Sequence, residues 1–237
     1  MDAAARRILA GHALGGYAHG PDAPIEATAR AMAKVGTAAA LILVEGVSDQ
    51  IAVETAATAL GRDLAADRVV VVPIGGAHAI GRFLATLGPA GAALRLAGLC
   101  DLREAELFRR GLTGAFRATV DDGVSPATAP PEVSPATVQD GVSRATVHVC
   151  VEDLEDELIR AVGVAAVEAL CDTQGDLRSL RSLQRQPAWR DQPPDAQLRR
   201  FLGSGARRKL RYARLLVAAA AVRGTVPAPL CALLAAV

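Results

Sequence analysis

Four short runs of apolar residues stand out along the chain, and none of them alternates with polar residues. They are Ala40–Val44, Val69–Val72, Leu94–Cys100 and Thr146–Val151. A strand with one exposed face alternates between apolar and polar side chains, whereas a strand of a parallel sheet is covered on both faces and is apolar throughout. The pattern therefore predicts four buried parallel strands.

Stretches with helical character separate these runs. Asp49–Leu60 and Ala77–Leu87 lie between the first three runs, and Asp101–Arg110 follows the third. Strands that alternate with helices are typical of α/β proteins, because a parallel strand needs a crossover connection to reach its neighbour. We therefore predict an α/β fold in which helices flank a parallel sheet.

The other segments set the expected domain boundaries. Residues 1–37 are Ala-rich and predict a helical lead-in to an α/β domain at 38–172, and a basic helical C-terminal region is expected at 173–237. After the fourth strand, helices are predicted at Leu154–Leu170, Ala196–Phe201 and Ala206–Val222.

Residues 115–145 contain a short repeat. Val-Ser-Pro-Ala-Thr occurs at 124–128 and again at 133–137, and Val-Ser-Arg-Ala-Thr follows at 142–146. Three polar copies of this length cannot bury a core, which argues against a solenoid. We expect a disordered loop before the fourth strand.

Composition excludes several classes of protein. No apolar run approaches the roughly 20 residues of a membrane span, and the N-terminus shows no secretory signal, so we expect a cytoplasmic protein without membrane contact. The four cysteines are far apart and form no C-x-x-C pair, which argues against a zinc or redox motif.

Charge is unevenly distributed although the net charge is only +1. Five of the six residues at 152–157 are acidic, whereas 178–214 holds eleven Lys and Arg residues and only two Asp. An acidic segment followed by a basic one indicates a cation site beside an anion-binding surface.

Carboxylates follow three of the four predicted strands. Glu45 follows the first, Asp101 the third and Asp153 the fourth, and Asp49 lies in the helix after the first. Ligands of an open parallel sheet bind at the carboxyl ends of its strands, where grouped carboxylates suit Mg²⁺ or Mn²⁺. The alternative for Asp49 and Asp101 is a helix start, where acids are favoured without any ligand.

The basic segment offers candidate phosphate contacts. Lys209 is one of only two lysines, and Arg207, Arg208 and Arg211 surround it. Such residues bind phosphate backbones without reading sequence. The alternative is the ordinary basic face of a surface helix.

Three segments together resemble the Toprim domain. They are Leu41–Asp49, Val69–Pro73 with Gly75 and Gly76 after it, and Leu96–Asp101. Toprim domains occur in topoisomerases, primases, recombination proteins and the OLD (overcoming lysogenization defect) nucleases. The four-residue step from Glu45 to Asp49, the later Asp153-Leu-Glu155 and the downstream Lys209 are most similar to the OLD type, over roughly residues 38–215.

The resemblance implies a metal-dependent DNA phosphodiesterase with a Toprim-like sheet. Glu45, Asp49 and Asp101 would hold one Mg²⁺ or Mn²⁺, and Asp153 and Glu155 would help to hold a second. The implied role of Lys209 is to stabilise the charge of the transition state.

Two departures from the family keep alternatives open. The third-strand motif is usually Asp-x-Asp, but here it is Asp101-Leu102-Arg103, so Glu104 or the acids of 153–157 compensate or a metal site is lost. OLD nucleases carry an ATPase domain ahead of the Toprim domain, whereas here only about 37 residues precede it, so we expect a stand-alone protein whose ATPase is separate or absent. A degenerate module that binds DNA or a partner ATPase, and a nucleotidyl transferase, are the alternative functions.

Overall fold

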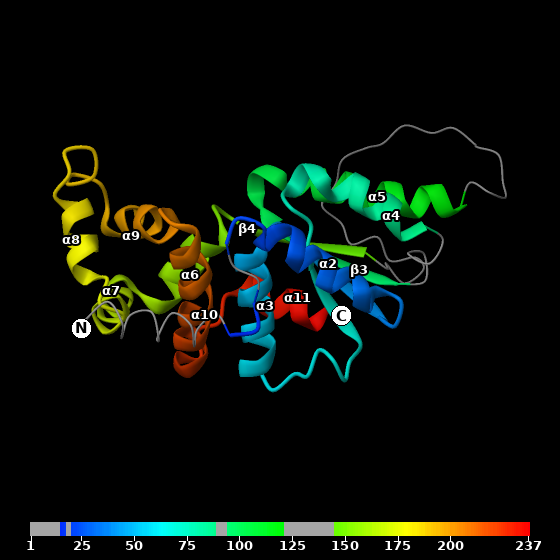
Figure 1. Ribbon diagram of the computed structural model, residues 1–237, viewed down its shortest axis with the longest axis horizontal. Helices are drawn as coiled ribbons and strands as arrows, with labels where there is room; N and C mark the ends of the chain where they lie inside the picture. The colour runs from blue at the N-terminus through cyan, green and yellow to red at the C-terminus, as the bar shows by residue number, and fades with distance from the viewer. Residues whose placement is uncertain (1–14, 18–19, 89–93, 121–144) are drawn as a thin grey trace.

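The computed structural model describes residues 15–17, 20–88, 94–120 and 145–237. Its centre is a four-stranded sheet with the order β2-β1-β3-β4, in which every neighbouring pair is parallel (Figure 1). The strands are β1 (Ala40–Val44), β2 (Val69–Pro73), β3 (Arg95–Asp101) and β4 (Ala145–Cys150). The predicted α/β fold with four parallel strands is confirmed.

The two faces of the sheet belong to two different hydrophobic cores. In β1, Leu41 and Leu43 pack into one core, whereas Ile42 and Val44 pack into the other. All five residues of this strand are fully buried. Side chains of a strand alternate between the faces, so a strand covered on both sides must be apolar at every position.

One face of the sheet is covered by α4 (Ile80–Leu87) and α5 (Ala105–Val120). Gly98 in β3 allows α5 to approach closely, because a Cβ atom at this position would lie 2.7 Å from Cδ1 of Phe108. A short 3₁₀ helix precedes each of the two helices, η1 (Ala77–Ala79) and η3 (Leu102–Glu104).

The opposite face is covered by α3 (Val47–Ala59), α10 (Ala206–Arg223) and α11 (Ala228–Ala235). The helix α10 packs along α3, and α11 contacts β3 and β4. The C-terminal helices therefore share a core with the sheet. Figure 1 shows α2 (Ala23–Val35) beside the sheet, where it contacts β2.

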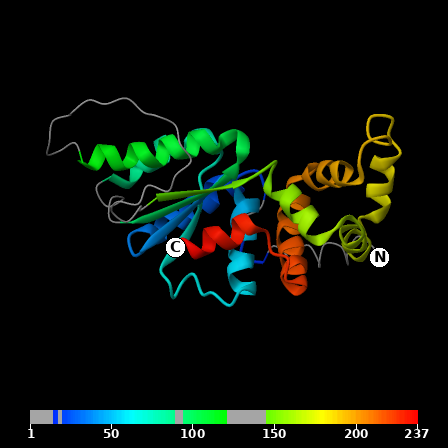
Figure 2. The same cartoon turned by 180° about the vertical axis from the view of Figure 1, so that it is seen from behind.

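The remaining helices extend beyond the carboxyl end of β4, as Figure 2 shows from behind. They are α6 (Leu154–Val162), α7 (Val164–Thr173), α8 (Leu177–Gln184) and α9 (Pro194–Gly203). The single helix predicted at Leu154–Leu170 is corrected to two helices. Gly163 separates them with a φ of +84°, a value that ends a right-handed helix.

Several predicted features lie partly outside the described residues. Residues 121–144, which make up most of the predicted repeat loop at 115–145, lie outside the described residues. The helix α5 continues to Val120, beyond the predicted helix end at Arg110. The first fourteen residues of the predicted lead-in also lie outside the described residues. The predicted domain boundaries stay predictions.

Within the described part of the chain, no single helix combines the length and apolar character needed to cross a membrane. The bent pair α10 and α11 meets the same criteria jointly, with an angle of 89° between the two helices.

Candidate metal site

Glu45 leaves the carboxyl end of β1 and is positioned by a glycine turn. The backbone N–H groups of Gly75 and Gly76 both donate to the carbonyl oxygen of Glu45, at 3.1 and 2.9 Å. These glycines have φ values of +79° and +102°, which residues with a side chain rarely adopt. The turn after β2 therefore uses its N–H groups to hold the chain at Glu45.

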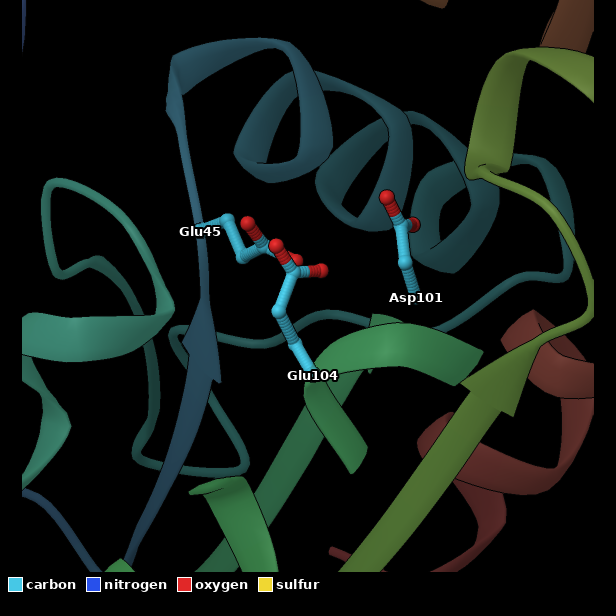
Figure 3. A group of neighbouring side chains, drawn as sticks. All are labelled: Glu45, Asp101 and Glu104. Carbon is cyan, nitrogen blue, oxygen red and sulfur yellow. The ribbon is translucent and has the colours of Figure 1, made fainter. Parts of the chain in front are cut away.

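Asp101 and Glu104 bring two more carboxylates to Glu45. Asp101 ends β3, and Glu104 lies in η3 directly after it. One carboxylate oxygen from each of the three residues lies within 4.8 Å of the other two. Figure 3 shows Glu104 reaching from η3 toward Glu45, with Asp101 beside them. We call Glu45, Asp101 and Glu104 the acid triad.

The electrostatics of the acid triad disfavour its charged form when no cation is present. Burial raises the pKa of Glu45 to about 8, and a hydrogen bond with Glu104 and the negative charges nearby add to this. Burial and the charges of Asp153 and Glu104 raise the pKa of Asp101 to about 7. Like charges that share a site disfavour ionisation unless a cation bridges them.

Asp49 lies close to the triad but has a structural partner. Its Oδ2 accepts a hydrogen bond of 3.0 Å from the backbone N–H of Gly46, at the residue that caps α3. Burial raises the pKa of Asp49, while the charge of Lys209 opposes the shift. The sequence grouped Asp49 with Glu45 and Asp101, and the structure gives the third place in the triad to Glu104.

Asp153 and Glu155, which the sequence assigned to a second metal, are both engaged by other groups. Oδ1 of Asp153 accepts from the backbone N–H of Asp156 at 2.8 Å and caps α6, and Oδ2 accepts from Nε of Arg199 at 2.6 Å. Oε1 of Glu155 lies 3.2 Å from Nζ of Lys209. Burial raises the pKa of Glu155 to about 6, although Lys209 partly offsets this.

A cavity of about 280 Å³ joins these groups at the carboxyl edge of the sheet. Lys209 enters it from α10, and the pKa of Lys209 is raised because the charges of Glu155 and Asp49 outweigh the opposing effect of burial. Its lining residues are Glu45, Gly46, Ser48, Asp49, Gly76, Asp101, Asp153, Leu154, Glu155 and Lys209. The cavity thus brings together a lysine and two carboxylates of the acid triad.

The three arginines predicted to contact nucleic acid have different environments. Arg207 is exposed. Arg208 is half-buried, stacks on the ring of Phe201 at 4.0 Å and donates to the Phe201 carbonyl oxygen. Arg211 is only 8% exposed and pairs with Asp176. This corrects the predicted contact set, because a buried, paired guanidinium at Arg211 is not free to contact a phosphate.

The donor set of the acid triad fits a hard divalent cation. All three side chains offer carboxylate oxygens, which Mg²⁺ and Mn²⁺ prefer. In addition, Oε2 of Glu104 is buried and has no hydrogen-bond partner among the described residues. A buried carboxylate oxygen without a partner is unfavourable, and a bound cation would satisfy it.

Sequence reasoning missed Arg199 and left Glu104 as one of several possible compensating acids. Glu104 had a usable signal, because it lies one turn beyond Asp101 at a strand end. Arg199 had none, because it is one of many arginines in a basic segment and meets Asp153 only through the packing of α9 against α6.

The fold is a parallel α/β sheet with grouped carboxylates at its carboxyl edge. Residues 37–101 match the family model of the TOPRIM domain of overcoming lysogenization defect protein-like sequences. Residues 37–101 thus resemble the OLD-like TOPRIM domain, and over these residues the resemblance found in the sequence is confirmed. No curated protein matches the chain significantly.

Solved structures with a similar fold come from two bacteria. The C-terminal region of the Xanthomonas campestris pv. campestris OLD protein superposes with a TM-score of 0.56 and 23% identity, covering 86% of this chain and 93% of that one. The C-terminal region of the Burkholderia pseudomallei OLD protein superposes with a TM-score of 0.52 and 20% identity, covering 84% of this chain and 96% of that one. Most of the chain therefore shares the fold of OLD C-terminal regions.

Proposed function

We propose that this protein is a metal-dependent phosphodiesterase that cleaves DNA. The observation that carries the proposal is the acid triad, three carboxylates within 4.8 Å of one another at the carboxyl edge of a Toprim-type sheet. Glu45, Asp101 and Glu104 would hold a Mg²⁺ or Mn²⁺ ion. Such an ion, when bound, polarises a phosphoryl oxygen and lowers the pKa of bound water.

Lys209 has the position of a charge-stabilising residue in this proposal. Its ammonium group lines the same cavity as Glu45 and Asp101, and Glu155 orients it at 3.2 Å. A phosphodiester gains negative charge on its oxygens in the transition state, and a fixed cation in a partly buried cavity stabilises that charge. The raised pKa of Lys209 keeps the group protonated at neutral pH.

The proposed substrate is DNA, bound through its backbone. Arg207 is exposed on the first turn of α10, close in sequence to Lys209. Aromatic residues make up only 3% of the chain, which does not favour recognition by base stacking. A partner ATPase, expected from the OLD resemblance, stays a prediction.

A plasmid assay tests the proposal. Supercoiled DNA is incubated with the protein and Mg²⁺ or Mn²⁺, with and without a chelator, and we expect nicked and linear products only when the metal is available. Glu45→Gln should abolish the products. Glu106→Gln is the matched control, because Glu106 is an exposed glutamate on α5 that pairs only with Arg110 and should leave cleavage unchanged.

One observation favours the alternative of a module that binds DNA without cutting it. Arg103 stands where the usual motif has a second aspartate, and it is exposed beside Asp101. Salt-sensitive DNA binding without metal-dependent cleavage, by protein that binds Mn²⁺ normally, would support this alternative and contradict the proposed cleavage.

A further inference from the structure

We infer that the centre holds a single divalent cation, and that Arg199 and Lys209 occupy the acids that a second cation would need. The inference rests on the proposed function only in that the acid triad binds a metal. It concerns the other acids that line the cavity, Asp49, Asp153 and Glu155. We call these three residues the paired acids.

Asp153 has both carboxylate oxygens engaged. Oδ1 caps the first turn of α6, and Oδ2 receives the Nε–H of Arg199, whose Nη1 also reaches Oε2 of Glu152 at 3.2 Å. The Asp153 side chain is only 21% exposed, so water would replace little of what is lost. To ligate a metal, Asp153 would have to share one of its oxygens with the guanidinium of Arg199 or with the N-cap hydrogen bond of α6, and the positive charge of Arg199 opposes a second cation there.

Glu155 and Asp49 each have one carboxylate oxygen engaged. The Glu155 side chain is 13% exposed and pairs with Lys209, and Oδ2 of Asp49 accepts the N–H that begins α3. Lys209 also interacts electrostatically with Asp49 and Asp153. A second divalent ion on these residues would lie beside the ammonium group, and the repulsion of the two cations would oppose its binding.

The two groups of acids therefore differ in charge balance. The paired acids carry three potential negative charges against the two positive charges of Arg199 and Lys209. The acid triad also carries three potential negative charges, but within the described residues no lysine or arginine forms an ion pair with its carboxylates. At Arg103 the chain also carries a cation where a further carboxylate ligand would otherwise stand. These observations limit the strong cation site to one.

A single cation held by the acid triad would share the stabilisation of negative charge with Lys209, which lines the same cavity as Glu45 and Asp101. In two-metal sites, two ions about 3.5–4 Å apart stabilise the attacking and leaving oxygens symmetrically. Here the fixed ammonium group would contribute the second positive charge. It would stay in place whether or not metal is bound.

The test is the number of Mn²⁺ ions bound per chain, measured by titration calorimetry and by native mass spectrometry. We expect one ion on the unaltered protein and two on the double variant Arg199→Gln with Lys209→Gln, because that variant frees Asp153 and Glu155. Arg200→Gln is the matched control. Its guanidinium lies over the ring of Trp189 at 5.8 Å, and this variant should bind one ion.

The outcomes separate the inference from the proposed function. Two ions on the unaltered protein overturn the inference and leave the metal-dependent function intact. No bound ion contradicts both. A double variant that folds and still binds one ion also overturns the assignment to Arg199 and Lys209.

A second variant covers the case in which the double variant does not fold. Asp153→Asn keeps an N-cap residue, and we expect its affinity for Mn²⁺ to fall less than about tenfold, because Asp153 acts on Asp101 through its charge and is not a ligand. A loss of about tenfold or more, as is typical when metal ligands or their supports are changed, would contradict the inference.

Discussion

Two groups of acids at the carboxyl edge of the sheet differ in their partners. The acid triad consists of carboxylates whose charged neighbours are other carboxylates, and Oε2 of Glu104 is buried without a hydrogen-bond partner among the described residues. The paired acids are stabilised by a lysine, an arginine and the N–H groups at two helix starts. Grouped acids at a sheet edge are therefore not equivalent, and their partners distinguish acids that pair with cations and cap helices from acids that meet other carboxylates.

The difference has an energetic basis. Carboxylates that crowd together destabilise the folded chain, and a protein retains such an arrangement where function requires it. Carboxylates that cap helices and pair with cations stabilise the folded chain. Substitutions in the two groups should therefore have opposite effects, which the following experiments measure in order of expected size.

Glu45→Gln should cause the largest change, and it should affect activity. Removing one charged ligand should lower metal-dependent cleavage at least about 100-fold, which corresponds to about 2.7 kcal/mol of transition-state stabilisation. The stability of the metal-free protein should not fall, because one member of a repelling group has become neutral. Cleavage rates and thermal unfolding in chelator measure the two effects.

The same variant should also lose the stabilisation that Mn²⁺ provides, since a ligand stabilises only the state that binds it. If Glu45→Gln lowers the stability of the metal-free protein while Mn²⁺ still raises its melting temperature as before, Glu45 is structural and belongs with the paired acids.

Much of the fold could be predicted from the sequence because the sheet is buried on both faces. Continuous apolar runs such as Ala40–Val44 are typical of strands in a parallel sheet, and the observed strands begin and end within one residue of the predicted ones. The break between α6 and α7 escaped prediction because one glycine in an apolar stretch does not reveal its φ. The helix α11 was not predicted, because a short Ala- and Leu-rich end has no polar face to define a period.

The site could be predicted only in part. Strand ends are visible in a sequence, so Glu45 and Asp101 were found at one edge. The identity of each partner is not visible, because Arg199 reaches Asp153 from 46 residues away and Arg211 reaches Asp176 from 35. Sequence alone therefore could not show that Asp153 and Arg211 have charged partners within the fold, and the roles predicted for the acids stay predictions.

Asp153→Ala should cause the next largest change, and it should affect stability. The substitution removes the N-cap of α6 and the partner of Arg199, so the free energy of unfolding should fall by about 1–2 kcal/mol, the usual cost of a lost aspartate cap. Denaturant unfolding of the metal-free protein measures it. An unchanged stability would mean that Asp153 is as poorly partnered as the acid triad.

The stability of the metal-free protein should fall as pH rises from 6.5 to 8. The folded-state pKa values of Glu45 and Asp101, about 8 and about 7, lie above the ordinary values of 4.5 and 3.8. Between these values the folded chain binds more protons than the unfolded chain, so stability decreases with increasing pH. His148, whose pKa is lowered by burial, acts in the opposite direction mainly below this range.

Melting temperatures across this range measure the effect. A change of about 1 kcal/mol moves the midpoint of a domain of this size by about 2–4 °C. Glu45→Gln should flatten the decline, and saturating Mg²⁺ should reduce it because the ion favours the ionised carboxylates. A decline of equal slope in Glu45→Gln would assign the pH dependence to groups outside the acid triad.

The distinction between partnered and unpartnered groups extends to the arginines of α10, where the expected effect is smallest. Arg207 is exposed, whereas Arg211 is buried against Asp176. Each phosphate contact contributes about 0.9 to the slope of log affinity against log salt concentration for duplex DNA, so Arg207→Gln should reduce the slope by about that amount and leave stability unchanged. Arg223→Gln, at the far end of the same helix, is the matched control and should leave the slope unaltered. Fluorescence anisotropy of a labelled duplex at several salt concentrations measures it. Equal slopes for Arg207→Gln and the unaltered protein would place the DNA contact elsewhere and leave the start of α10 as an ordinary solvated surface.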